Sequence, residues 1–482
     1  MPHADTPVVV LFRNDLRVSD NLALSAAAAT GRPLVTLFIL EDAGKGARPP
    51  GAARRWWLHH SLEALSRRMA ALGGRLLLRR GTTAGVVDAV LAATGADAVY
   101  WNRRYDPPAI AVDAAMKTGL RGRGIRAESF DGCLLHEPAR LSTGAGTPYR
   151  VFTPFWRALA DGPEPRDPAD PPRHLRAFSG PVGGEDLGSW NLLPRQPDWA
   201  GGLRESWTPG EDGASSRLAD FLDERIDGYR LGRDRPGVEA TSRLSPHLAH
   251  GEITPFQVVA ALRSRRDIAG SGDAETFRKE LAWREFSHHL LFHYPALASR
   301  NHDGRFDDFP WRDDHAALRR WQQGRTGFPI VDAGMRQLWR TGWMHNRVRM
   351  VAASFLVKHL LVDWRAGERW FWDTLVDADP ANNPASWQWV AGSGADTAPY
   401  FRVFNPILQG EKFDPEGDYV RSHVPELADL PAKFIHQPWK APEAVLSAAG
   451  VKLGTTYPVT LIEHHEARSR ALAAYERLRG HG

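Results

Sequence analysis

The spacing of apolar residues changes once along this chain, and that change limits the folds open to it. In the first part, two kinds of segment alternate: short apolar runs at 8–12, 34–40, 76–78, 98–101 and 127–130, and segments of helical spacing at 21–30, 56–72 and 85–94. Short buried strands that alternate with helices imply a parallel sheet with right-handed crossovers. We therefore predict an α/β domain with a doubly wound parallel sheet over residues 1–130.

A different composition follows. Eight prolines lie among glycines and aspartates between positions 163 and 197, which is typical of a surface connector, here assigned to 131–210. Beyond it the spacing is helical and strand alternation does not return, with expected helices at 215–227, 255–263, 274–293, 315–323, 331–341 and 343–361. We predict a larger all-α domain over 211–475.

The charge distribution and the cysteine content limit which partners, disulfides and metal sites this chain can have. The 482 residues carry a net charge of only +4, yet eleven arginines and no lysine lie between 281 and 350, against seven acids. Arginine suits planar contacts to phosphate, so a polyanion partner is predicted; a solvated face of ion pairs is the alternative. Cys133 is the single cysteine, which excludes an internal disulfide and a cysteine-based metal cluster, and no metal is expected.

No targeting or membrane signal stands out. The first seven residues lack the basic start and apolar core of a signal peptide, and the apolar run 351–362 is interrupted by Lys358 and His359. We expect a cytoplasmic protein without a membrane partner.

Tryptophans concentrate in the second half. Eleven of eighteen lie beyond position 280, and the segment 377–389 sets Trp387 and Trp389 close to paired acids and amides. Indole is easily oxidised and stacks on bases, so this composition suits electron movement beside a nucleic acid. Core packing is the alternative for any single indole.

Three local motifs could form a site. Hydroxyls and an arginine at 241–245 precede Pro246, which indicates either an anion cradle or an ordinary helix cap. Segment 343–350 is predicted to be helical, which places Trp343, Asn346, Arg347 and Met350 on one face, unless they form a core stripe. Glu280, Trp283 and Arg284 lie within about one and a half helical turns, where a surface Glu–Arg pair is the alternative. The Asn382–Asn383 pair could simply end a helix.

The sheet domain lacks the usual nucleotide-binding fingerprints. No Gly-x-Gly-x-x-Gly follows residues 8–12, and there is no Walker loop. Any nucleotide cofactor is therefore expected outside the sheet domain.

A series of segments resembles the photolyase/cryptochrome family over nearly the whole chain. They are Phe12-Arg13-Asn14-Asp15-Leu16-Arg17, the run from Tyr149 to Phe155, Phe401-Arg402-Val403-Phe404-Asn405-Pro406 and the run from Gln409 to Phe413. Within the family the chain looks most like the microbial class I cyclobutane pyrimidine dimer (CPD) photolyases. The resemblance implies an N-terminal antenna domain and a C-terminal helical domain that binds FAD.

The resemblance also implies site residues. Those assigned to the cofactor are Tyr229, Thr241, Ser242, Arg243, Leu244, Ser245, Trp343, Asn346, Arg349, Asp377, Ala378, Asp379 and Asn383, the last facing flavin N5. An amide at that position can donate or accept as N5 changes protonation. Residues assigned to damaged DNA are Arg233, Glu280, Trp283, Arg284, Arg347, Met350, Trp389, Arg402, Gln409 and Lys412.

The implied reaction is light-driven repair of UV-damaged DNA. Excited FADH⁻ would pass an electron to a pyrimidine dimer flipped out of the helix, the cyclobutane bonds would split, and the electron would return. Glu280 would hydrogen-bond the pyrimidine edges. Trp387, Trp364 and Trp311 match the family's electron relay for reducing the oxidised flavin.

Alternatives remain within and outside the family. A (6-4) photolyase usually has histidines at the positions of Asn346 and Met350. A cryptochrome receptor often carries a long C-terminal tail, whereas this sequence ends at Gly482. Asn383 also argues against the plant receptor type, which usually has Asp there. If the protein were a light-independent DNA-binding flavoprotein, the tryptophan relay would have no function.

A second chromophore, 8-hydroxydeazaflavin, is preferred to folate because Pro108-Ala109 replaces the usual Asn-Glu; another flavin or an empty site is the alternative. A monomer is expected.

Overall fold

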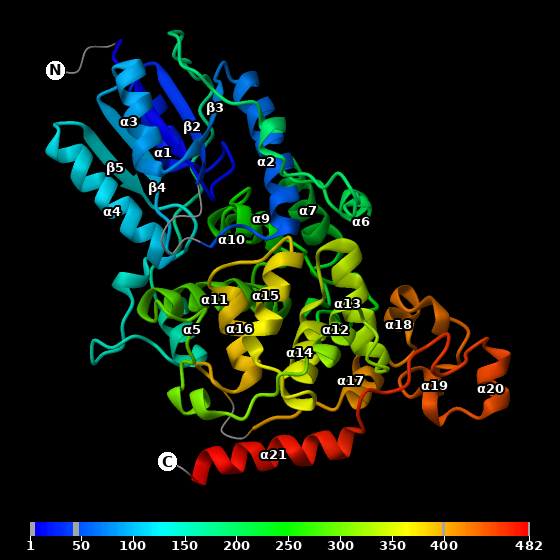
Figure 1. Cartoon of the computed structure of the whole chain (residues 1–482). Coiled ribbons are helices and arrows are strands. Elements are labelled where there is room, and N and C mark those ends of the chain that lie inside the picture. The colour runs from blue at the N-terminus through cyan, green and yellow to red at the C-terminus, as the bar shows by residue number, and fades with distance from the viewer. Residues whose placement is uncertain (1–4, 42–47, 398–400, 481–482) are drawn as a thin grey trace.

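A five-stranded parallel sheet forms the centre of the N-terminal part (Figure 1). A computed structural model describes residues 5–41, 48–397 and 401–480. The sheet order is β3-β2-β1-β4-β5, with strands β1 (Val8–Phe12), β2 (Leu34–Glu41), β3 (Leu76–Gly81), β4 (Ala98–Asn102) and β5 (Arg126–Phe130). Val8 aligns with Leu34 on one side and with Ala98 on the other. The predicted parallel sheet is confirmed.

Alternate residues of β1 face opposite layers of helices. Val8, Val10 and Phe12 pack with α1 (Leu22–Ala28) and α2 (Ala52–Ala71). Val9 and Leu11 pack with α3 (Thr83–Thr94) and α4 (Pro107–Gly122). Because successive strand side chains point to opposite faces, a fully apolar strand such as β1 requires both layers. The sheet is therefore doubly wound.

Helix α4 is absent from the sequence prediction. It begins with two prolines behind the N-cap Asp106, and its buried positions are only Ala109, Asp113, Met116 and Leu120. Proline fits the first turn of a helix, where its missing N–H has no partner to lose. The sparse apolar stripe explains why periodicity alone misses the helix.

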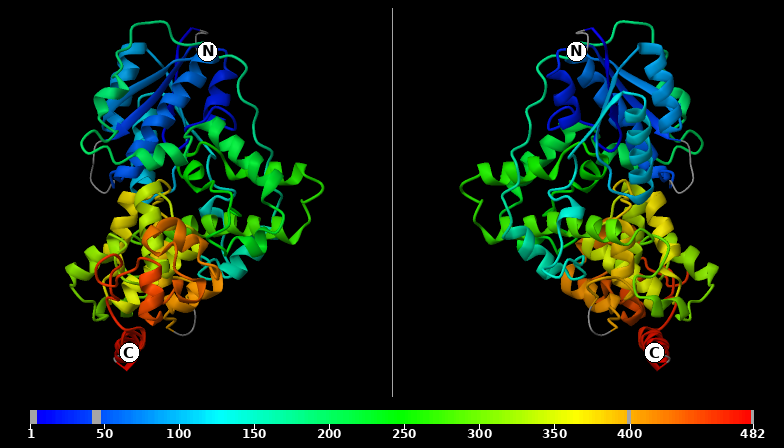
Figure 2. Two further views of the ribbon diagram at one scale, coloured as in Figure 1. Left: turned by 90° about the vertical axis from the view of Figure 1, so that its right-hand side faces the viewer. Right: turned by 90° about the vertical axis from the view of Figure 1, so that its left-hand side faces the viewer.

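The proline-rich segment runs along the outside of the molecule between the two parts (Figure 2). It is more ordered than expected, with α5 (Phe152–Ala160), α6 (Gly201–Ser206) and two 3₁₀ turns, Pro138–Arg140 and Leu187–Trp190. Leu175 and Trp190 are buried in the sheet domain's core. The segment therefore packs at intervals instead of only wrapping the surface.

The other named elements of the described chain are helices and helical turns joined by loops. The helices are α7 (Glu211–Glu224), α8 (Tyr229–Gly232), α9 (Ser245–His250), α10 (Pro255–Ser264), α11 (Gly272–His293), α12 (His315–Gln322), α13 (Pro329–Thr341), α14 (Asn346–Ser354), α15 (Trp364–Thr374), α16 (Asn382–Ala391), α17 (Pro406–Phe413), α18 (Asp418–His423), α19 (Ala432–Ile435), α20 (Glu443–Ala448) and α21 (His464–Gly480). Short turns lie between them: η3 (Gly304–Asp308), the π-helical η4 (Phe355–His359), η5 (Pro425–Leu427) and η6 (Pro438–Lys440). Helix α21 lies across the end of the molecule farthest from the sheet (Figure 1).

One helix prediction was wrong in detail, and one alternative is excluded. The helix expected from position 343 begins only at Asn346, because Gly342 ends α13 in a left-handed conformation and His345 caps α14. Trp343 therefore lies in the turn before α14. The Asn382–Asn383 pair begins α16 instead of ending a helix.

The sheet and helical parts touch through polar contacts as well as packing. Glu211 accepts hydrogen bonds from the Val18 and Ser19 N–H groups at 2.9 Å each, and Asp373 accepts one from Ala52. Among the helices of the described residues, none is long and apolar enough to cross a membrane.

Candidate functional site

A cavity of about 560 Å³ lies within the helical part. Its walls come from α8, α9, α11, α14, α15, α16 and the loop before α9. Figure 1 shows α11, α14, α15 and α16 near the centre of the molecule. Every residue that the resemblance assigned to the cofactor lines it, from Tyr229 and 241–245 to Asn383. Its volume falls in the usual range of small-molecule sites.

Hydroxyls and cations gather at one side of this cavity. Ser245 Oγ donates to Asp377 Oδ2 at 2.6 Å, and Arg349 Nη2 donates to the same oxygen at 2.8 Å. The other oxygen, Asp377 Oδ1, is buried without a partner among the described residues. Arg243, in the left-handed region with φ 50°, holds its guanidinium 4.9 Å from the centre of the Trp343 ring. This side of the cavity suits a phosphate-bearing ligand.

Asp379 is the most strongly held acid of the site. Its Oδ1 accepts hydrogen bonds from the N–H groups of Ala381 and Asn382 at 2.9 and 2.7 Å, and its Oδ2 lies 3.5 Å from His288 Nε2. Burial alone raises the pKa of Asp379, but its interactions with His288, with the Arg284 guanidinium and with the Asn382 N–H outweigh burial and lower the pKa well below its usual value. The carboxylate is therefore ionised at neutral pH.

The amide of Asn383 has a fixed orientation. Its Nδ2 donates to the Glu368 carbonyl at 3.1 Å and to Glu368 Oε1 at 2.7 Å. Glu368 is itself held by Arg48, which donates to both carboxylate oxygens at 2.6 and 2.9 Å. Asn383 Oδ1 is then the atom available to the cavity. Neither Glu368 nor Arg48 was predicted, since each lies far from Asn383 in the sequence and no local pattern marks them.

Glu280 lies at another part of the cavity wall. Arg233 Nη1 donates to Glu280 Oε1 at 2.5 Å, and a parallel pair joins Arg347 to Asp234 at 2.8 Å. Burial raises the pKa of Glu280 above its usual value, although Arg233 opposes that shift.

Aromatic groups line the same region. Trp283 stacks on Phe152 of α5, with ring centres 3.7 Å apart and planes inclined by 6°. Trp389 and Met350 also line the cavity. Arg284 does so too, but its Nη1 donates to the Cys133 carbonyl at 2.8 Å and its side chain is largely buried. The flat indole surfaces are suited to stacking on bases.

Two of the predicted relay tryptophans lie behind the cavity. Trp387 lines the cavity and belongs to a hydrophobic core cluster of the helical part. Trp364 is fully buried in that cluster, and Trp311 packs against it and is partly exposed. Trp387 sits directly on Gly367 of α15, where an added Cβ would lie 2.1 Å from the Trp387 ring. The three indoles therefore belong to one packed region that begins at the cavity and reaches the surface.

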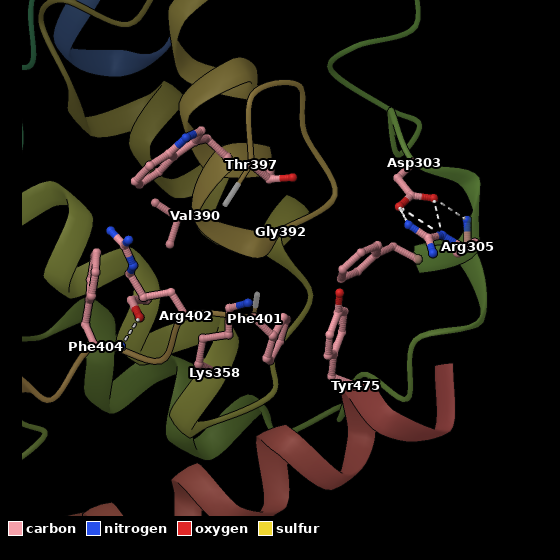
Figure 3. Close-up of a pocket in the computed structure, with 13 residues that line it drawn as sticks. Asp303, Arg305, Lys358, Val390, Gly392, Thr397, Phe401, Arg402, Phe404 and Tyr475 are labelled. Carbon is pink, nitrogen blue, oxygen red and sulfur yellow. Dashed lines mark hydrogen bonds and ion pairs between the residues drawn. The ribbon is translucent and has the colours of Figure 1, made fainter. Parts of the chain in front are cut away.

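A smaller pocket of about 210 Å³ shares Trp389 and Val390 with the main cavity (Figure 3). Arg402 lines this pocket and not the main cavity. Lys358 is buried here, where Nζ donates to the Ala391 carbonyl at 2.7 Å and lies over the Phe401 ring, and burial lowers its pKa. Gln409 and Lys412 are on α17, outside both linings.

The sequence did not identify several residues that complete the main cavity. Among them are Ser287, Met344, Ala353 and Phe371. Ala353 follows Met350 by three positions and could have been found by extending the helical face. Phe371 could not, since it enters from α15.

Two family models match the chain: "DNA photolyase" over residues 8–173 and "FAD binding domain of DNA photolyase" over 277–477. A deoxyribodipyrimidine photo-lyase of Agrobacterium fabrum is 57% identical and covers 97% of each chain. Cryptochrome-1 of Arabidopsis thaliana is 38% identical over 96% of this chain and 69% of its own.

A crystal structure described as a bacterial class III photolyase from Agrobacterium tumefaciens superposes with a TM-score of 0.97. It is 55% identical and covers 100% of this chain and 99% of its own. This chain belongs to the photolyase/cryptochrome family. The comparisons do not confirm the expected class I subtype.

Proposed function

We propose that the protein is a light-driven DNA repair enzyme, a deoxyribodipyrimidine photo-lyase that splits cyclobutane pyrimidine dimers. The observation that carries this proposal is that Glu280, Trp283 and Met350 line the same cavity as the residues assigned to the cofactor. The high identity to a deoxyribodipyrimidine photo-lyase supports the same reaction.

FAD fits the chemistry of this cavity. The hydroxyls at 241–245 with Arg243 would hold the diphosphate, and Arg349 would pair with Asp377 beside the flavin. The unpartnered Asp377 Oδ1 supports a polar ligand at that point. When bound in its reduced form, FAD supplies the electron that light transfers to the dimer.

The chain's own residues would orient both molecules. Asp379 keeps a negative charge in the cavity, and Asn383, fixed by Glu368, presents an acceptor oxygen. Glu280 would turn from Arg233 to the polar edge of the flipped pyrimidines, where its carboxylate oxygens could accept hydrogen bonds. Arg233 would then be free to meet phosphates, Arg347 would contact them beside its partner Asp234, and Trp283 and Trp389 would stack on the bases. Arg284, Arg402, Gln409 and Lys412 remain candidates for DNA contact.

The tryptophans Trp387, Trp364 and Trp311 would carry electrons from the surface to an oxidised cofactor. Their packing in one region supports this assignment.

Repair of defined lesions under light tests the proposal. Protein with chemically reduced FAD is mixed with DNA that contains cyclobutane thymine dimers, illuminated with near-ultraviolet or blue light, and assayed for restored thymines. We expect restoration in the light and none in the dark. Repair of only (6-4) photoproducts would favour that subgroup, and no repair of either lesion would favour a cryptochrome receptor or a light-independent flavoprotein.

A second chromophore is proposed to be 8-hydroxydeazaflavin. The support is the sequence at the start of α4, where Pro108 and Ala109 stand in place of the Asn-Glu of folate-binding members. The absorption spectrum of protein purified from its native host tests it, and a folate band would contradict it.

We also propose that the protein acts as a monomer in the cytoplasm. Size-exclusion chromatography with light scattering, and fractionation of the native host, test these two points.

A further inference from the structure

A cluster of imidazole and carboxylate groups lies on α2, in the sheet domain and apart from the main cavity. His59 and His60 are neighbours in the sequence, and Glu63 lies one turn further on. The three side chains can each offer one ligand atom, and these atoms lie within 4.8 Å of one another.

The individual distances are close to those of a coordination shell. His60 Nδ1 lies 2.9 Å from Glu63 Oε2, and His59 Nε2 lies 3.5 Å from Glu63 Oε1. A tetrahedral zinc ion holds its ligand atoms about 3.4 Å apart. The two contacts reach different oxygens of Glu63, and one ligand atom from each residue lies within 4.8 Å of the other two, so small side-chain rotations would bring three such atoms around one ion.

The surroundings favour a metal over a simple ion pair. His59 is 8% exposed, so its ring is held in place by the surrounding side chains. The ring of His60 is braced edge-on against the buried Trp56, with centres 4.8 Å apart. The Glu63 side chain is 42% exposed, which leaves one side of the cluster open to water.

We propose that His59, His60 and Glu63 form a binding site for a divalent transition metal, most suitably Zn²⁺. Two imidazole nitrogens and one carboxylate oxygen are ligands that zinc prefers, and solvent would supply the remaining position. The site is independent of the proposed repair function, because none of its ligands lines the main cavity.

Zinc binding to the full-length, tag-free protein tests the site. After treatment with a chelator and its removal, the protein is titrated with zinc sulfate by isothermal titration calorimetry. We expect one equivalent to bind. X-ray absorption of the zinc complex should show nitrogen and oxygen ligands with the outer-shell pattern of two imidazoles.

Variants then locate the ion. His60→Gln and Glu63→Gln change half-exposed side chains and should leave the circular dichroism spectrum unchanged. Each should weaken zinc binding by more than about tenfold, since even the loss of an outer-sphere partner of a metal costs about 10- to 100-fold. His315→Gln is the matched control, because His315 is exposed and pairs with Asp313 at 3.2 Å, and among the described residues the pair belongs to no group of three possible metal ligands. Zinc binding that is absent from the unaltered protein, or equally strong in all three variants, would overturn the proposal.

Discussion

Glu280 is a cavity residue whose carboxylate is held by an ion pair. In the structure it pairs with Arg233 and lines the cavity beside Trp283. We expect Glu280→Ala to lower the quantum yield of dimer repair by about tenfold, because a hydrogen bond to a charged group contributes about 1.5–3 kcal/mol. Flavin content, read from the absorption spectrum, should not change. A repair yield equal to that of the unaltered protein would remove Glu280 from the mechanism.

Trp311 is the partly exposed member of the predicted relay. Its indole packs against Phe309 with ring centres 4.4 Å apart, so phenylalanine should fit in its place. We expect Trp311→Phe to abolish light-driven reduction of the oxidised flavin, because phenylalanine is much harder to oxidise than tryptophan. Dimer repair should be retained once the flavin is reduced chemically. Normal photoreduction in this variant would contradict the relay assignment.

At the level of elements, the contact between α15 and α16 sets the position of the cavity wall. Gly367 lets Trp387 approach the α15 backbone, since an added Cβ would lie 2.1 Å from the indole ring. We expect Gly367→Ala to lower the free energy of unfolding by about 1–3 kcal/mol through overpacking. Chemical denaturation measures this change.

A second helical glycine provides the control for that prediction. Gly119 of α4 has nothing within 4 Å of an added Cβ. Gly119→Ala should therefore raise the free energy of unfolding by about 0.5–1 kcal/mol, because alanine loses less conformational freedom in a helix. Equal effects of the two substitutions would mean that the Gly367 contact is not restrictive.

For the whole molecule, buried histidines predict sensitivity to acid. Burial lowers the pKa of His289 and His345 to about 4 and that of His359 to about 3. An unfolded histidine has a pKa of about 6.5, so the unfolded state binds protons first as the pH falls. The stability contributed by the neutral rings is complete above about pH 6.5 and is lost progressively toward pH 4.

Thermal unfolding at two pH values measures this loss. Between pH 7.5 and 5, each such histidine should cost up to about 2 kcal/mol. We expect a melting temperature several degrees lower at pH 5. A melting temperature that stays constant across this range would show that these rings are not buried in the neutral form.

Much of the fold follows from local patterns. Strands β1, β2, β4 and β5 were predicted within a residue or so of their ends, because a buried strand between turns is a short apolar run. Helix α4 was missed because its apolar stripe is sparse. Trp343 was placed in a helix because its spacing continues that of α14, although Gly342 permits the turn that separates it.

The sequence by itself determined the type of most elements of the sheet domain and, through the family resemblance, most residues that line the main cavity. Only the tertiary structure decided which groups hold them: Glu368 and Arg48 behind Asn383, Phe152 beneath Trp283, and Arg233 on Glu280. The physical reason is the separation along the sequence of the residues that touch. Periodicity is encoded between neighbouring residues, whereas these contacts join residues 15 to 320 positions apart and exist only once the helices have packed.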